Sequence, residues 1–161
     1  MTETASIDQH TQRLPAASAR QRILAQHTEL RRLLAMSVVQ SMGIVQDHPA
    51  QHESLRSLVT FIRAVFVQHL AEEEAVILPI LDDDLPLGPA RAELLRTEHA
   101  SQRAQLDGLC AWPEDGDEEE LARRFDGLAR QLLRDIAHEE RELLVPDVLR
   151  DDHIVIDQCG G

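Results

Sequence analysis

The sequence lacks three residue types altogether and contains few aromatic residues and few cysteines. Lysine, asparagine and tyrosine are absent from the 161 residues, aromatic residues make up 2%, and there are two cysteines, Cys110 and Cys159. Without lysine there is no amine for a Schiff base, and without tyrosine there is no side chain for a tyrosyl radical. Two cysteines are too few for a disulfide framework and fit a reducing cytoplasm. The shortage of aromatic residues favours packed helices with a core of Leu, Ile, Val and Ala over a β-sandwich.

Positive charge and long apolar runs are also scarce. The net charge is -13, which argues against nucleic acid or an anionic membrane as a partner, because both attract basic surfaces. The longest apolar run, Ala75–Leu81, is far shorter than the roughly 18 residues that a membrane-spanning helix needs. Residues Met1–Gln12 contain Glu3 and Asp8 and lack the apolar core of a secretion signal. We expect a cytoplasmic protein that binds neither nucleic acid nor membranes, and the sequence does not identify its protein partners.

Four segments with helical periodicity follow one another along the chain. Breaks rich in Pro, Gly and Asp separate them at Gly43–Pro49, Asp82–Pro89 and Trp112–Asp117. We predict an all-α protein, an antiparallel, up-down-up-down four-helix bundle over residues 16–149. Cys110 is expected on the apolar side of the third helix. Residues 1–15 are expected to form a disordered N-terminal arm and residues 150–161 a flexible C-terminal tail, with no role indicated for the Cys159-Gly160-Gly161 end.

A weak internal repeat relates the first and third segments. The pattern H-x-x-x-R-x-x-L occurs in both, at His27, Arg31 and Leu34 and again at His99, Arg103 and Leu106. Each segment is followed by one in which glutamates cluster near a histidine, HLAEEEAVILP and HEERELLVP. This pattern predicts two duplicated helical hairpins.

Ionisable side chains lie on the apolar faces of three of the predicted helices. At about 100° per residue, His27 falls within the apolar stripe of the first segment, His69 and Glu73 straddle the stripe of the second, and His99 lies on that of the third. A buried, ionised carboxylate without a partner is strongly unfavourable. Because these groups converge on one level, we predict that they share a cation. Imidazole and carboxylate are ligands for iron, manganese or zinc.

This set of residues resembles the hemerythrin-like (HHE cation-binding) domain family over about residues 20–147. The resemblance rests on His27, on His69-x-x-x-Glu73 followed by Pro79, on His99, and on the acidic HEERELLVP segment. It implies a four-helix bundle that holds a non-haem di-iron centre bridged by carboxylates and an oxo or hydroxo group. It also implies that the three histidines are imidazole ligands and that Glu73 is a bridging carboxylate. Family members bind or sense dioxygen, react with nitric oxide or peroxide, or store iron, so the expected partner is a small diatomic or peroxide ligand.

The fourth segment departs from the family pattern, which usually has His-x-x-x-Glu there. Two frames compete, His138 with Glu142 and Asp135 with Glu139. Helical periodicity turns Asp135 and Glu139 towards the apolar stripe and His138 towards the polar face. It therefore favours Asp135 and Glu139 as metal ligands, with His138 as the alternative to Asp135. A π-bulge would turn His138 and Glu142 inward, so both frames remain open.

The expected function is that of a hemerythrin-like di-iron protein that binds, senses or detoxifies a small oxidant inside a helix bundle. One alternative is a ferritin-like iron oxidation or storage protein, which needs Glu-x-x-His pairs on two helices, whereas this sequence offers only Asp135-x-x-His138. The other is a metal-free helical interaction module, which would leave Glu73 buried and unsatisfied. The sequence does not decide between an enzyme and a binding protein.

Overall fold

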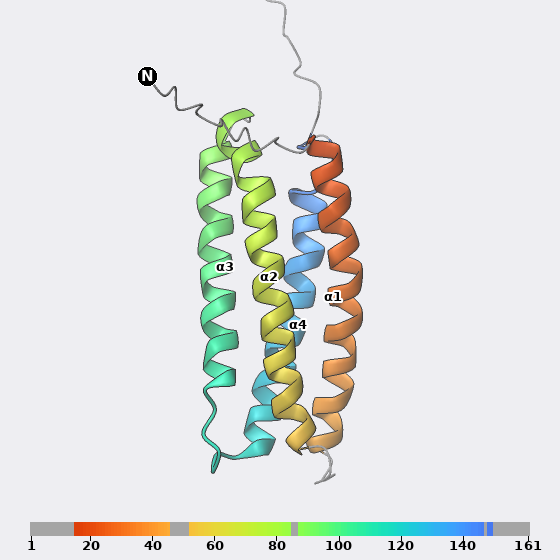
Figure 1. The fold of residues 1–161 in the computed structure, drawn as a ribbon, viewed down its shortest axis with the longest axis vertical. Coiled ribbons are helices and arrows are strands. Elements are labelled where there is room, and N and C mark those ends of the chain that lie inside the picture. Colours follow the sequence, from red (N-terminus) through yellow and green to blue (C-terminus); the bar gives the residue numbers. More distant parts are fainter. Residues whose placement is uncertain (1–14, 46–51, 85–86, 147, 150–161) are drawn as a thin grey trace, which may run out of the picture.

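The computed structural model describes residues 15–45, 52–84, 87–146 and 148–149. They form four α-helices: α1 (Ala16–Val45), α2 (His52–Asp84), α3 (Gly88–Cys110) and α4 (Glu118–Glu142). The helices alternate in direction and lie lengthwise along one another, which confirms the predicted all-α four-helix bundle (Figure 1). The expected N-terminal arm, apart from residue 15, and the expected C-terminal tail lie outside the described residues. No described helix combines the length and the apolar character needed to span a lipid bilayer.

The helix ends differ from the predicted breaks by a few residues. Helix α1 extends to Val45 and α2 continues through Pro79 to Asp84, so both enter segments that were expected to be breaks. The N-cap of α4 is Asp117, whose side chain accepts hydrogen bonds from the backbone N–H groups of Glu119 and Glu120. The first turn of α4 is acidic, which suits the positive end of the helix dipole.

The helices pack unevenly against their neighbours. The closest pairs are α1 with α4 and α2 with α3, whereas α3 and α4 share a smaller contact although they follow one another in sequence. Close packing buries apolar surface and excludes water between two helices. Of the four boundaries between neighbouring helices, the one between α3 and α4 is therefore the least closely packed.

A layer of polar side chains divides the core into two apolar clusters. The larger cluster includes Leu34, Ile62, Phe66, Leu106, Phe125 and Leu132, and the smaller one includes Ile23, Ile77, Leu81, Leu95 and Leu144. Cys110 is not part of either cluster. The prediction that it faces the core is wrong, because this last residue of α3 lies at the rim of the apolar stripe, next to Thr60 and Arg63 of α2, and is exposed. The polar layer, in contrast, is buried among the helices and is the candidate site.

Candidate metal centre

Five of the seven residues predicted as metal ligands meet in the buried polar layer, and they come from all four helices. They are His27 of α1, His69 and Glu73 of α2, His99 of α3 and Glu139 of α4. They form two groups, His27 with His69 and Glu73, and Glu73 with His99 and Glu139. Within each group the candidate ligand atoms lie within 4.8 Å of one another. Glu73 belongs to both groups, so its carboxylate lies between two candidate metal positions.

The inward-facing atoms of this layer lack partners within the protein. The Nε2 atoms of His69 and His99 lie 3.4 and 3.6 Å from Oε2 of Glu73, and Nε2 of His27 lies 3.5 Å from Oε2 of Glu139. Both carboxylate oxygens of Glu73 and the Nε2 atoms of His27 and His99 are buried without a hydrogen bond. An unsatisfied buried polar group costs about 1–3 kcal/mol. These nitrogen and oxygen atoms therefore fit a bound metal ion, which would give each of them a partner.

The outward-facing Nδ1 atom of each histidine has an oxygen acceptor. These contacts join His27 to Glu140 at 3.2 Å, His99 to Glu74 at 3.0 Å, and His69 to Gln26 at 2.9 Å. Because carboxylate and amide oxygens accept hydrogen bonds, Nδ1 must carry the proton and donate it. The lone pair is then on Nε2, which faces the centre. This is the tautomer that binds a metal through Nε2.

Arginines hold two of these acceptors in place. Arg31 lies one turn after His27 and binds Glu140 at 2.6 Å, and Arg103 lies one turn after His99 and binds Glu74 at 2.8 Å. The internal H-x-x-x-R pattern thus corresponds to the same contact made twice. We call each set of a histidine, its glutamate and the arginine a clamp. The third acceptor, Gln26, donates to Glu72, which also binds Arg22.

The inner groups have pKa values that disfavour charge. Burial raises the pKa of Glu73 to about 8. Burial, with a further effect from Glu73, raises the pKa of Glu139 to about 9. Burial also lowers the pKa of all three histidines, that of His69 to about 3. The imidazoles are therefore neutral and able to coordinate, and a cation would favour the ionised form of both carboxyls.

The outer carboxylates behave in the opposite way. Burial alone would raise the pKa of Glu74, but hydrogen bonds from Arg103 and His99 outweigh it, so the pKa is lowered. The pKa of Glu140 is lowered in the same manner, because the hydrogen bond and charge of Arg31 outweigh burial. An ionised carboxylate thus accepts from His27 and from His99, and it increases the basicity of each ring towards a metal.

Two predicted residues lie outside both groups. Asp135 is half-buried and accepts a hydrogen bond of 3.2 Å from Nε2 of Gln102, while His138 is exposed. Helix α4 is regular up to Glu142, with no π-bulge. The helix therefore turns Glu139 inward and His138 outward, as its periodicity indicated. That Asp135 and Glu139 bind metal stays a prediction.

The sequence reasoning missed the outer partners of the histidines. Glu74 and Glu140 each follow an inner glutamate directly, and Gln26 directly precedes His27. The consecutive glutamates and the repeated arginine were visible in the sequence. Which glutamate contacts which histidine, however, depends on how neighbouring helices face each other. Gln102 was also missed, although a buried polar residue between His99 and Leu106 interrupts the apolar stripe of α3.

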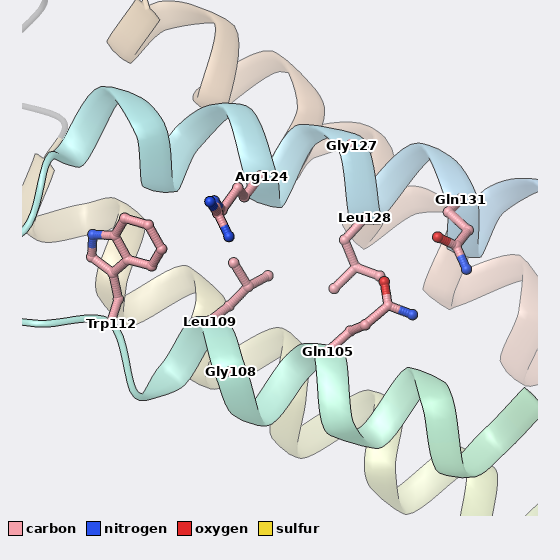
Figure 2. Close-up of a pocket in the computed structure, with 8 residues that line it drawn as sticks. All are labelled: Gln105, Gly108, Leu109, Trp112, Arg124, Gly127, Leu128 and Gln131. Carbon is pink, nitrogen blue, oxygen red and sulfur yellow. The ribbon is translucent and has the colours of Figure 1, made fainter.

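A groove of about 440 Å³ lies between α3 and α4, beyond the metal centre towards Trp112. Figure 2 shows Trp112 and Arg124 at one end, Leu109 and Leu128 along it, and Gln105 and Gln131 at the other end. The Arg124 guanidinium lies 5.2 Å from the centre of the Trp112 ring, within the range of a cation–π contact. Gly108 and Gly127 also line the groove, and a Cβ added to either one would meet nothing within 4 Å.

Comparison with known proteins gives one match. The family model described as the hemerythrin HHE cation binding domain matches residues 18–145. Searches of curated proteins and of solved structures found no significant match. The matched range covers most of the chain and contains both groups of inner residues and both clamps.

Proposed function

The chain belongs to the hemerythrin HHE cation-binding family, and from this premise we propose that it is a non-haem di-iron protein that binds, senses or detoxifies a small oxidant: dioxygen, peroxide or nitric oxide. The observation that carries the proposal is the position of Glu73. Its two carboxylate oxygens are buried and unpartnered, and it belongs to both groups of candidate ligands. A carboxylate shared in this way is suited to bridge two metal ions in a helix bundle.

The donor set of each group favours iron and leaves room for a further ligand. His27, His69 and Glu73 provide two imidazoles and one carboxylate, a set typical of non-haem iron(II) sites with open coordination positions. Glu73, His99 and Glu139 provide one imidazole and two carboxylates. Iron held by these side chains would supply redox chemistry and a coordination position for a small molecule.

The surrounding protein limits what can reach the centre and keeps the ligands in place. Apolar clusters lie on both sides of the polar layer along the bundle, so water and large substrates are excluded from it. The clamps hold His27 and His99 with Nε2 facing inward. These features support a small neutral ligand more than an organic substrate. They also favour the proposal over a metal-free interaction module, which would leave the inner atoms unsatisfied.

Metal content is the direct test of the proposal. Protein purified from iron-replete cells should contain about two irons per chain by plasma emission analysis. Because metal that binds the folded state stabilises it, chelation should lower the melting temperature. A stable, folded protein without metal, whose melting temperature does not respond to a chelator, would contradict the proposal.

Optical spectroscopy tests the open coordination position. The oxidised protein should show near-ultraviolet charge-transfer bands that change on addition of peroxide, azide or nitric oxide. A Glu73→Gln variant is the control, since it removes the carboxylate shared by the two groups while keeping the side chain's size. Iron-loaded protein whose spectrum is indifferent to all three ligands would indicate a closed, structural site.

A further inference from the structure

The four boundaries between neighbouring helices differ at the level of the metal centre. We call each boundary a seam. Three seams are crossed by an arginine–glutamate pair: Arg22–Glu72 joins α1 to α2, Arg103–Glu74 joins α2 to α3, and Arg31–Glu140 joins α1 to α4. A positive guanidinium thus lies in each of these three seams. Each of these pairs is close to neutral, because the guanidinium compensates the carboxylate beside it.

The α3–α4 seam has no such pair. Among the described residues no ion pair joins these two helices, and the hydrogen bond from Gln102 to Asp135 is their only polar side-chain contact. Glu98 of α3 and Asp135 of α4 are half-buried at this seam. Both lie close to candidate ligands, since Glu98 directly precedes His99 and Asp135 lies one turn before Glu139. The seam therefore presents negative charge without a compensating arginine.

Gln102 provides a second, independent feature of this seam, a buried oxygen without a partner. Its side chain is 3% exposed, and its carbonyl oxygen Oε1 is buried without a hydrogen-bond partner. Since Nε2 of the same amide contacts Asp135, Oε1 lies beside that carboxylate. Amide and carboxylate oxygens are common ligands of divalent cations. A passing cation would satisfy the unpartnered oxygen.

The internal repeat shows that this polar seam belongs to only one half of the bundle. The position three residues after the histidine is Leu30 in α1 and Gln102 in α3, and the position four residues before the inner glutamate is His69 in α2 and Asp135 in α4. Leu30 is part of the apolar core. Gln102 and Asp135 thus stand in α3 and α4 at the positions where α1 and α2 have a leucine and a histidine.

The α3–α4 seam is also loosely packed. The groove between α3 and α4 begins about one turn from the Gln102–Asp135 pair, at Gln105 and Gln131 (Figure 2). The glycines at positions 108 and 127 leave open space beside it. Two helices with few contacts between them separate more easily than closely packed ones.

We propose that divalent metal ions enter and leave the centre through the α3–α4 seam, by way of the carboxylates of Glu98 and Asp135 and the amide oxygen of Gln102. Asp135 is one turn from Glu139, and Gln102 is one turn from His99. An ion that leaves Asp135 and Gln102 therefore arrives directly at Glu139 and His99, which belong to the second group of candidate ligands. This inference rests on the proposed function only in needing a metal centre, and it concerns the route to that centre.

The rate of metal uptake tests the route. Apoprotein is mixed with Co²⁺ in a stopped-flow instrument, and the absorbance of the bound ion is followed. Release is measured by adding excess EDTA to the loaded protein. Glu98→Gln and Asp135→Asn each remove one negative charge with little change of shape, and each should slow uptake about three- to tenfold. Glu93→Gln is the matched control, because this residue of α3 is exposed and outside the seam.

Gln102→Leu provides a second test, because it introduces the residue found at the equivalent position of α1. Uptake and release should both become slower, with the amount of Co²⁺ bound at the end unchanged. If variants at Gln102 or Asp135 only accelerate release and leave uptake unaffected, these side chains hold the metal and do not conduct it, and the inference is wrong. It is also wrong if Glu93→Gln slows uptake as much as Glu98→Gln. Wild-type protein that binds no metal would instead refute the proposed function itself.

Discussion

The two helical hairpins of the bundle are alike on the outside of the metal centre and different on the inside. Outside, His27 and Arg31 of the first hairpin contact Glu140 of the second in the same way as His99 and Arg103 of the second contact Glu74 of the first. Inside, the first half has His69 where the second has Asp135. The two halves therefore hold an imidazole in the same way but differ at the inner position.

The difference at the inner position changes what each half can do. His69 reaches the centre, and its Nε2 atom lies 3.4 Å from Glu73. Asp135 has a shorter side chain than His69 and accepts a hydrogen bond from Gln102 of the neighbouring helix. The first group therefore has two neutral imidazoles, and the second has one imidazole with two carboxylates. The two metal positions are thus unequal in ligand type.

The largest expected effect comes from removing the carboxylate that both halves share. Glu73→Gln should abolish metal binding at both positions, since it takes one of three candidate ligands from each group. In wild-type protein, metal present at about 100 times its dissociation constant stabilises the fold by about 2.7 kcal/mol for each occupied site. Chelation should therefore lower the stability of wild-type protein by about that amount per bound metal and leave the variant unchanged. Metal analysis and thermal melts with and without chelator measure this.

A matched variant sharpens the same comparison. Glu139→Gln removes a ligand from the second group only, so about one metal per chain should remain at the first group, which keeps its full set of donors. Equal metal loss in the Glu73 and Glu139 variants would show that the two positions fill only together.

A smaller effect is expected along the fourth helix. Asp135→Ala should reduce the iron content partly, because a half-buried carboxylate beside the second group is lost. His138→Ala should leave iron nearly intact, since this ring is exposed on a regular helix. Plasma emission analysis of both variants decides the ligand frame. If His138→Ala abolishes iron binding while Asp135→Ala does not, the family's His-x-x-x-Glu frame is correct and the helix must rearrange when it binds metal.

Much of the fold and the inner layer could be predicted from the sequence, for a simple physical reason. His27, His69, Glu73 and His99 are polar residues at positions where the helical repeat demands apolar ones, so each stands out in one helix alone. The same repeat oriented Glu139 and His138. The prediction for Cys110 was wrong because this residue lies at the rim of the apolar stripe of α3. There a small difference in helix rotation separates a buried side chain from an exposed one.

The outer partners could not be found in this way. Glu74, Glu140 and Gln26 are polar residues on partly exposed faces, where polar residues are ordinary. Their roles depend on which helix lies beside them and at what height. The pairing of Arg31 with Glu140 joins residues 109 positions apart, and no single-helix periodicity contains that information.

The clamps predict an intermediate effect that should be equal in the two halves. Glu74→Gln and Glu140→Gln each replace an ionised acceptor by a neutral one, so each should weaken metal binding about tenfold. Competition with a chromophoric chelator measures the affinities. A clear inequality would show that the likeness of the two clamps is geometric only. Glu29→Gln is a suitable control, because this glutamate is exposed and forms an ion pair with Arg32 of its own helix.

The smallest expected effect concerns the open space at the α3–α4 seam, where the second half of the bundle is loosest. Gly127 lies within α4, is exposed, and would place a Cβ where nothing lies within 4 Å. Gly127→Ala should therefore stabilise the protein by about 1 kcal/mol in urea denaturation, because alanine favours the helix over glycine. Gly116, in the turn before α4, is the contrasting position: its added Cβ would lie 2.6 Å from Nε1 of Trp112 and 3.0 Å from the backbone oxygen of Pro113. Gly116→Ala should destabilise the protein, since the indole must shift to admit the methyl group. Metal content should stay unchanged in both variants. If Gly127→Ala is destabilising, the methyl group meets atoms there, and the seam is closed in solution.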